Sequence, residues 1–409
     1  MNIIQFKNYN YTIIKEKDET ERDIGYTIVE NCKLVGRNNF NPNILLYNGK
    51  LITPYDEKVM SLKKDSFYDN NIYEINEEIE SQNILYKNPV FFFIYNFDNY
   101  YHFLYDTLPY LYTYLYLKKK IPELKLLINY PNKFKKDFYR FNIEFLEKIV
   151  STDDLIIYTE NTVYSYIYIS SSLTHGGFSN NPPRNEIYEV YDIIKSNVNL
   201  IKSNLEYIYI SRRTWINDDK TNIGTDYTTR RKMMNEDLLV AELIKLGFVE
   251  IFAENLTTDE KINIFSNAKI IIGSIGGGMA NLLFSKKNTK SIVLVTPYFL
   301  DINYRFKYSM ESSNITYFND IQTYKENNIP LYCRAKIVNS KSKYFDKIGE
   351  IIDFVDDKYK LNISNNDVVG FNNLINYETD YFKSNELELL DNGLNSPYIV
   401  NIKNLLSII

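Results

Sequence analysis

The sequence has few of the residues that bind metals or form disulfides, with two cysteines and two histidines among 409 residues. Cys32 and Cys333 lie far apart and neither belongs to a Cys-x-x-Cys pair, so neither a thiolate metal site nor a disulfide framework is indicated. An Asp-x-Asp triplet, which would suit a magnesium-bound diphosphate, is also absent. We therefore expect a metal-independent protein of a reducing compartment, the cytoplasm.

Long apolar runs and an excess of basic charge are missing as well. The net charge of −5 and the pI near 5.4 argue against nucleic acid as a partner, because phosphate backbones attract a basic surface. No run of about 18 apolar residues occurs, so no membrane span is predicted. The first residues, MNIIQFKNYN, carry polar and charged side chains too early for a secretory signal. The 44% apolar content predicts a soluble chain of two domains.

Glycine is scarce too, yet three of the 14 glycines are consecutive at positions 276–278. They follow the β-branched run at residues 270–272 and precede an apolar, helix-compatible segment at residues 279–284. This order predicts a strand, a glycine loop and a helix. Backbone N–H groups in such a loop, with the partial positive charge at a helix start, suit a phosphate. The same residues also fit a tight turn that binds no ligand.

The N-terminal half is expected to begin with an irregular β-rich lead-in over residues 1–95. Its last part, VFFFIY at residues 90–95, is a continuous apolar run typical of a strand covered on both faces. Further strands at residues 124–128 and 155–158, around a helix at residues 133–150, give a βαβ pattern that predicts a small parallel sheet.

Residues 96–120 are predicted to form an amphipathic helix in which four leucines make one apolar stripe. His102 and Asp106 are four residues apart, roughly opposite this stripe, which directs the pair toward a surface or a cleft. A carboxylate there could take a proton from a sugar hydroxyl, with Asp106 as the base and His102 as an alternative base or a partner. The other interpretation is a helix-start hydrogen bond at His102 and a merely exposed Asp106. Pro109 is expected to kink the helix.

From residue 206 the pattern becomes a regular alternation of strands and helices that predicts a doubly wound parallel sheet. Thr257, with Glu260 three residues later, marks one helix start as a capping box. Ligands bind such sheets at the carboxyl ends of the strands, where both the Ser211-Arg212-Arg213 segment and the glycine loop fall. The strands are predicted at residues 206–210, 248–253, 269–272 and 291–295.

Basic residues gather around a loop at this edge of the sheet. A guanidinium group binds a phosphate through two parallel hydrogen bonds. A departing diphosphate that has no metal beside it needs such positive charge nearby. We therefore expect a diphosphate site made by the glycine loop, with Asn281 as a further contact, and by Arg212, Arg213, Arg230, Arg231 and Lys232. A solvated charged loop and an ordinary helix-surface asparagine are the alternatives. The glycine spacing is not that of a dinucleotide motif, and a P-loop would need Gly-Lys-Ser/Thr.

Beyond about residue 301 the alternation weakens. Four short β-like runs, CRAKIV, KIGEIIDFV, YKLNI and DVVGF, occupy residues 333–371. They are separated by turn signals and predict a small antiparallel barrel or β-module. The tail at residues 385–409 predicts one helix and an apolar end.

The sequence contains five motifs in a fixed order: NYYHFLYDTLP (99–109), YISRR (209–213), RKMMNEDLL (231–239), LTTDEKINIFSNAKIIIG (256–273) and GGGMANLLF (276–284). This is the order seen in family 61 glycosyltransferases, and the chain resembles their capsular-polysaccharide-type members from bacteria and giant viruses. The resemblance covers residues 90–298, and five ordered motifs are much more specific than any single one. For a viral member, the cytoplasm would be that of the host.

The resemblance implies an α/β fold of the GT-B type, with two facing Rossmann-like domains and the active site between them. It also implies inverting transfer of a sugar from a UDP- or GDP-sugar to a glycan or glycoprotein acceptor, without an obligatory metal or other cofactor. We expect an N-terminal acceptor-side domain with its β-rich lead-in at residues 1–184. A nucleotide-sugar domain follows at residues 185–310, and an appended β-module with the tail at residues 311–409.

Carried over by position, the family's His-x-x-x-Asp motif corresponds to His102 and Asp106, with Asp106 as the catalytic base. The family's arginine after the strand is Arg212, and its basic residue before Asn-Glu is Arg231. Together with the basic cluster and the glycine loop, the expected donor and diphosphate site comprises Arg212, Arg213, Arg231, Lys232, Asn235, Glu236, Gly276, Gly277, Gly278, Met279 and Asn281.

Two positions depart from the family pattern. Ile275 stands where many members have a histidine, so a polar group near the donor is replaced. Leu294 or Val295 stands where a glutamate usually ends the strand, so a ribose or base contact is missing. These departures and the appended β-module favour a second interpretation, a non-catalytic glycan-binding or assembly protein that kept the fold.

Overall fold

The chain divides into two compact units, unit 1 with Met1–Ile201 and Thr257–Asn263, and unit 2 with Lys202–Leu256 and Ile264–Ile409. Helix α7 (Ile187–Ser196), expected at the start of the second domain, belongs to unit 1. No helix in the described ranges is long and apolar enough to cross a membrane. The computed structural model describes residues 2–35, 43–46, 50–53, 84–95, 97, 99–131, 137–159, 162–174, 182–201, 204–213, 231–296, 307–308, 314–326, 329–331, 333–364, 377–390 and 396–409.

Unit 1 is built on a mixed sheet with the strand order β1-β5-β4-β3-β10-β7-β8-β9, in which β2 also pairs with β3 and β6 with β10. Neighbours among β10, β7, β8 and β9 run parallel, which confirms the predicted parallel sheet. The lead-in strands extend this sheet, since β3 pairs antiparallel with β10. The strands are β1 (Asn2–Gln5), β2 (Tyr11–Lys15), β3 (Ile24–Val35), β4 (Asn43–Leu46), β5 (Lys50–Thr53), β6 (Ile84–Tyr86), β7 (Val90–Phe92), β8 (Lys125–Ile128), β9 (Leu155–Ile157) and β10 (Thr162–Ser170).

Aromatic side chains form much of the core of unit 1. All six residues of the VFFFIY run at residues 90–95 are buried, as its continuous apolar character predicts. Phe91 on β7 meets Tyr114 on helix α5 (Leu111–Lys118) edge-on, with ring centroids 5.6 Å apart. Phe103 contacts Phe141 on helix α6 (Arg140–Leu146) in the same manner, at 5.6 Å. Such edge-to-face pairs stabilise a core beyond their buried area.

A buried ion network fixes the start of helix α7. Arg184 is only 4% exposed, and its Nε and Nη2 atoms donate to the two carboxylate oxygens of Glu186 at 2.9 and 2.8 Å. Its Nη1 atom lies 3.2 Å from Oδ2 of Asp18 and donates to the carbonyl oxygen of Arg22 at 2.8 Å. These bonds hold the pKa of Glu186 down at about 2, with the Arg184 guanidinium as the main cause.

Replacing Arg184 with methionine is expected to lower the free energy of unfolding by about 3 kcal/mol at neutral pH, the low end of the usual cost of breaking a buried ion pair. The change removes both guanidinium bonds from the largely buried Glu186 and leaves it only the ion pair with Lys15, at 3.1 Å. The depressed pKa of Glu186 means that its stabilisation is present above pH 5 and is lost as the pH falls toward 2. Urea unfolding between pH 7 and pH 3 measures both effects. Between pH 7 and pH 3, the free energy of unfolding of the Arg184→Met variant should fall less than that of the wild type.

The matched control is Arg140→Met, since Arg140 is 42% exposed and lies 3.5 Å from Glu144. It should cost less than about 1 kcal/mol, as is usual for exposed ion pairs. Equal losses in both variants would contradict a special role for the buried network.

Unit 2 contains a parallel five-stranded sheet in the order β12-β11-β13-β14-β15. All its neighbouring strands pair in parallel, which confirms the predicted parallel sheet. The direction in which the chain adds strands reverses between β11 and β13. The strands are β11 (Tyr207–Ile210), β12 (Val249–Ile251), β13 (Ile270–Ser274), β14 (Lys290–Leu294) and β15 (Asn314–Phe318). Strand β15 comes from the region expected to form the appended module.

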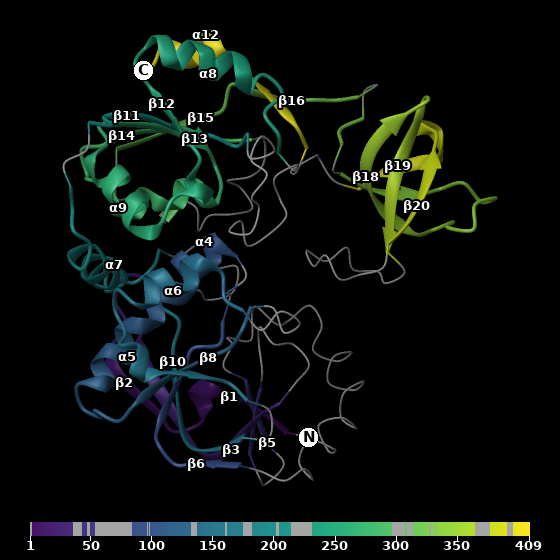
Figure 1. The fold of residues 1–409 in the computed structure, drawn as a ribbon. Helices are drawn as coiled ribbons and strands as arrows, with labels where there is room; N and C mark the ends of the chain where they lie inside the picture. The colour runs from purple at the N-terminus through teal and green to yellow at the C-terminus, as the bar shows by residue number, and fades with distance from the viewer. Residues whose placement is uncertain are drawn as a thin grey trace. The chain divides into compact units, whose positions relative to one another are not determined.

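Helices α8 (Glu236–Lys245) and α12 (Ile402–Leu406) lie on one face of this sheet, as Figure 1 shows. Helix α9 (Thr258–Asn267), whose residues from Ile264 on belong to unit 2, is on the other face. Its predicted capping box is confirmed, because Thr257 N donates to the Glu260 carboxylate at 2.7 Å and Glu260 N donates to Oγ1 of Thr257 at 3.2 Å.

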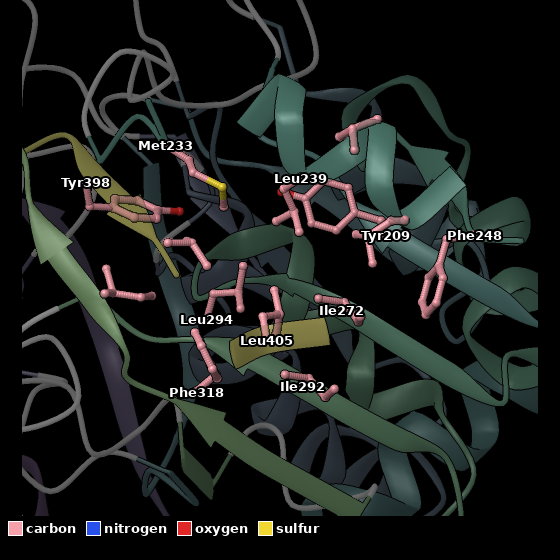
Figure 2. Close-up of a cluster of buried hydrophobic side chains, with 14 residues drawn as sticks. Tyr209, Met233, Leu239, Phe248, Ile272, Ile292, Leu294, Phe318, Tyr398 and Leu405 are labelled. Carbon is pink, nitrogen blue, oxygen red and sulfur yellow. The ribbon is translucent and has the colours of Figure 1, made fainter. Parts of the chain in front are cut away.

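The C-terminal tail returns to the core of unit 2. Strand β22 (Tyr398–Val400) pairs antiparallel with β16 (Ile321–Thr323), and α12 follows it. Figure 2 shows Tyr398 and Leu405 from this tail in one apolar cluster with Leu294 of the sheet. The tail is therefore a structural part of unit 2. It contains the predicted helix and, before it, a strand that the sequence did not predict.

The β-module is the part of unit 2 with a core of its own. Its order is β20-β19-β18-β17-β21, and every pairing is antiparallel, in agreement with the predicted antiparallel module. The run DVVGF at residues 367–371 lies outside the described residues. Ile337, Tyr359 and Phe382 are among the side chains of the core. The strands are β17 (Arg334–Ile337), β18 (Ile348–Val355), β19 (Lys358–Ser364), β20 (Tyr377–Phe382) and β21 (Leu387–Leu389).

Candidate functional site

The carboxyl ends of β11 and β13 lie side by side in unit 2. Ile210, the last residue of β11, pairs with Gly273 near the end of β13. In parallel α/β sheets, ligands bind where the strand order reverses, because the loops after the two strands leave in opposite directions and open a crevice. The segments that follow these two strands are Ser211-Arg212-Arg213 and the glycine loop. Two of the predicted motifs therefore meet at the switch point of the sheet.

Arg212 joins the two segments. Its Nη1 atom lies 3.4 Å from the carbonyl oxygen of Ile275 in the glycine loop. A Cβ atom built on Gly276 would be 3.0 Å from the same nitrogen, so a larger residue here would make the guanidinium move by a few tenths of an ångström. Arg212 is half-buried, so its positive charge is partly desolvated at the edge of the sheet. Charge in such a position attracts an anion more strongly than a fully hydrated arginine does.

Glu236 holds the backbone of Arg212 in place. It is the first residue of α8, is 1% exposed, and accepts three hydrogen bonds on Oε1. The donors are the Arg212 amide at 2.8 Å, the Tyr209 hydroxyl at 2.9 Å and the Ser211 hydroxyl at 3.2 Å. Burial raises the pKa of Glu236, and the bond from the Arg212 amide acts in the opposite direction. Glu236, one of the predicted site residues, therefore holds the backbone of Arg212 in position at the end of β11.

Arg213 is directed away from the switch point by two carboxylates. Its Nε and Nη2 atoms bind both oxygens of Glu250 on β12, at 2.9 and 2.5 Å. Its Nη1 atom binds Asp237 on α8 at 2.6 Å. The bonds to Glu250 are the main cause that raises the pKa of the Arg213 guanidinium further. Its charge is thus balanced inside the fold, whereas the sequence placed it with the diphosphate ligands.

The glycine loop leads into the predicted helix, which is a 3₁₀-helix, η7 (Gly277–Phe284). Gly277 and Gly278 are half-buried. Ile275, the substitute for the usual histidine, is buried, and its amide donates to the Leu294 carbonyl oxygen at 3.0 Å. Its side chain is therefore part of the core, and its carbonyl oxygen is the group that meets Arg212. The half-buried glycine amides are the groups that suit an anion.

Met279 and Asn281 are both fully buried in η7. A Cβ atom on Gly273 would lie 2.5 Å from the Met279 sulfur, so Met279 packs closely against the end of β13. Asn281 Nδ2 donates to the carbonyl oxygen of Gly278 at 2.9 Å. The structure therefore puts both residues behind the glycine loop, where they support its shape.

The basic segment before α8 is bound to the C-terminal tail. Asn235 exchanges two hydrogen bonds with the backbone of Val400, donating from Nδ2 at 2.8 Å and accepting on Oδ1 at 3.0 Å. The Lys232 carbonyl oxygen accepts from the Tyr398 amide at 2.9 Å. Arg231 has a left-handed backbone with φ of 55°, uncommon outside glycine and often found at functional sites. Arg230 lies outside the described residues.

The predicted His and Asp pair of unit 1 lies on an interrupted helix. Asn99 caps its first turn, α4 (Tyr100–His102), by accepting from the His102 amide at 3.2 Å. A π-helical turn (Phe103–Thr107) follows, and a short 3₁₀ turn contains Pro109. Proline has no N–H and its ring collides with the carbonyl group four residues earlier, so a wider turn before it relieves the clash. This is the interruption that Pro109 predicts.

His102 and Asp106 contact each other, as their spacing predicts. The Nδ1 atom of His102 lies 2.5 Å from Oδ2 of Asp106. Asp106 is 2% exposed, since the π-helical turn is buried over its full length, whereas the His102 side chain is 33% exposed. The sequence predicts that the pair points toward a surface or a cleft, and of the two side chains only that of His102 is exposed to solvent. The interpretation of Asp106 as a merely exposed residue is wrong.

A hydrogen bond from α7 holds the buried side of this pair in place. The Tyr191 hydroxyl of α7 donates to the Leu104 carbonyl oxygen at 2.9 Å inside the π-helical turn. Burial raises the pKa of both Tyr105 and Tyr191 well above the ordinary value, and the nearby Asp106 adds to the shift. A buried carboxylate bound to Nδ1 fixes the tautomer of a histidine and leaves its Nε2 atom as the proton acceptor. A histidine held in this way by a carboxylate has the geometry that general base catalysis requires.

Two residues near the switch point were not predicted. Ser274 ends β13 and its hydroxyl hydrogen-bonds to the hydroxyl of Tyr398 in β22. These positions are 124 residues apart, so no local pattern connects them.

Comparison with known proteins identifies one family. The model of the family described as Glycosyltransferase 61 matches residues 100–292. The match contains both the His102 and Asp106 pair and the switch point of the unit 2 sheet. No curated protein sequence matches the chain.

Proposed function

Residues 100–292 belong to glycosyltransferase family 61, and from this premise we propose that the protein transfers a sugar from a nucleotide-sugar donor to a glycan acceptor with inversion at the anomeric carbon. The coarser statement, a glycosyltransferase with a sugar donor and an acceptor, follows from the family. The donor type, the stereochemistry and independence from metals are our proposal.

The observation that carries the proposal is the meeting of Arg212 with the glycine loop at the switch point. A nucleoside diphosphate binds to N–H donors and positive charge at the carboxyl ends of the strands in such sheets, and Arg212 lies beside the glycine loop at these ends. In the proposed site Arg212 and the amides of Gly277 and Gly278 bind the diphosphate. Arg231 and Lys232 add positive charge. Glu236, Asn235, Met279 and Asn281 hold these groups in position.

We assign proton removal to His102. In an inverting transfer, the acceptor hydroxyl attacks the anomeric carbon and loses its proton as the bond to the diphosphate breaks. His102 accepts that proton on Nε2, and Asp106 stabilises the resulting imidazolium through Nδ1. This reverses the roles expected from the sequence, where Asp106 is the base. The buried position of Asp106 favours the reversal.

The leaving diphosphate gains negative charge in the transition state. Preorganised N–H groups and a guanidinium stabilise such charge without any reorganisation at the moment of reaction. We propose that they replace a divalent metal, in keeping with the absence of an Asp-x-Asp triplet from the sequence. The proposal also includes a GT-B fold, in which unit 2 binds the donor and unit 1 supplies the base.

The full chain should be tested for nucleotide binding by thermal unfolding with UDP-, GDP- and CMP-sugars. A donor at 100 times its Kd adds about 2.7 kcal/mol to the free energy of unfolding. We expect stabilisation by one nucleoside diphosphate sugar and none by CMP-sugars, whose leaving group has a single phosphate. The stabilising donor should then be incubated with glycan acceptors, and the configuration of the product read by NMR.

Removal of metals is the second arm of this test. Dialysis against EDTA should leave both the binding and the rate of transfer unchanged. Loss of activity that manganese or magnesium restores would contradict metal independence alone. If no nucleotide sugar stabilises the chain, the proposed enzymatic function is wrong and a non-catalytic glycan-binding protein is favoured.

A further inference from the structure

The C-terminal tail reaches the switch point from outside the matched family region, which ends at residue 292. Tyr398 is 1% exposed, and its hydroxyl hydrogen-bonds to Ser274, the residue before the glycine loop begins. Burial raises the pKa of Tyr398 to about 12, while the positive charges of Arg212 and Arg231 oppose the shift.

The backbone of the same residue holds the basic segment. The Tyr398 amide donates to the carbonyl oxygen of Lys232, and its own carbonyl oxygen accepts from Met234 at 2.8 Å. Two residues on, Val400 is bound at both backbone groups by Asn235. Figure 2 shows Met233, which lies between the two bonded positions, beside Tyr398 in the buried cluster. One strand of the tail thus fixes the segment that begins with Arg231.

We propose that strand β22 (Tyr398–Val400) is a functional part of the donor site, with Tyr398 as a positioning residue. Through its hydroxyl it fixes the end of β13, from which the glycine loop starts. Through its backbone it fixes the segment that carries Arg231 and Lys232. Two of the groups that would contact the diphosphate, the glycine loop and the segment with Arg231 and Lys232, are therefore held by one residue outside the matched region. This inference rests on the proposed function.

The direct test is Tyr398→Phe in the full-length protein, because phenylalanine keeps the buried ring and removes only the hydroxyl group. Loss of one hydrogen bond that orients the loop should raise the KM for the nucleotide-sugar donor by about 3- to 10-fold. The kcat and the KM for the acceptor should remain close to those of the wild type. A purely structural role would instead lower Tm and the fraction of active protein, without a change in donor KM.

Ser274→Ala removes the same hydrogen bond from the other side and serves if the Phe variant does not fold. Because both variants delete one interaction, the double variant should lose no more donor affinity than either single variant. The matched control is Asn404→Ala in α12, which deletes a tail hydrogen bond to Asp320 and should leave the donor KM unchanged.

The two proposals fail in different ways. If the wild-type protein binds donor and Tyr398→Phe and Ser274→Ala bind it equally well, the inference about the tail is overturned and the proposed function stands. If the wild-type protein binds no nucleotide sugar, the proposed function is overturned together with this inference.

Discussion

Replacing His102 with alanine is expected to lower the kcat of sugar transfer by about 10²–10⁴-fold, the usual contribution of a positioned general base. Asp106→Asn should cause a loss in the same range, because asparagine cannot stabilise the imidazolium or hold the same tautomer. Neither change touches the diphosphate site in unit 2, so donor affinity in a thermal-unfolding titration should equal that of the wild type.

Chemical rescue separates the base from its partner. Added imidazole should restore part of the turnover of His102→Ala, since it can take the proton in place of the missing ring. It should not restore Asp106→Asn, where the ring is still present. If His102→Ala keeps most of its turnover while Asp106→Asn loses it, Asp106 is the base and our assignment is wrong.

Arg212→Met is expected to lower kcat/KM for the donor by about 10²–10³-fold, the loss seen when one preorganised donor to a developing anion is removed. Methionine keeps the unbranched, apolar stem, so packing beside Gly276 changes little. The same variant should lose most of the stabilisation that the free nucleoside diphosphate gives to the wild type. Steady-state kinetics and thermal unfolding with the nucleotide measure the two effects.

The neighbouring arginine provides the matched control. Arg213→Met removes a guanidinium of the same type, but one whose hydrogen bonds go to Glu250 and Asp237. We expect it to lower Tm, because Glu250 loses its partner, and to leave the donor KM close to that of the wild type. Equal kinetic losses in the two variants would contradict the distinction between them.

Much of the candidate site follows from local sequence patterns. The β-branched runs before Arg212 and before the glycine loop predict two strands of a parallel sheet, and ligands bind at the carboxyl ends of such strands. His102 and Asp106 are four residues apart in a helical segment, which predicts their contact. These features depend on neighbours in sequence and on one general rule of sheet topology.

Other features depend on partners that are remote in sequence. Arg212 and Arg213 look equivalent in the sequence, and only the positions of Glu250 and Asp237 separate them. The burial of Asp106 results from the π-helical turn, which a regular helical periodicity does not contain. The tail has too few periodic residues to reveal that Tyr398 reaches Ser274.

The central claim is that a nucleoside diphosphate binds where β11 and β13 end. Hydrogen–deuterium exchange of the full chain, with and without the nucleotide that stabilises it most, tests this claim directly. The account predicts slower exchange in peptides that contain residues 211–213 and 275–279. Slower exchange confined to the β-module at residues 333–389, with no change at these two segments, would contradict it.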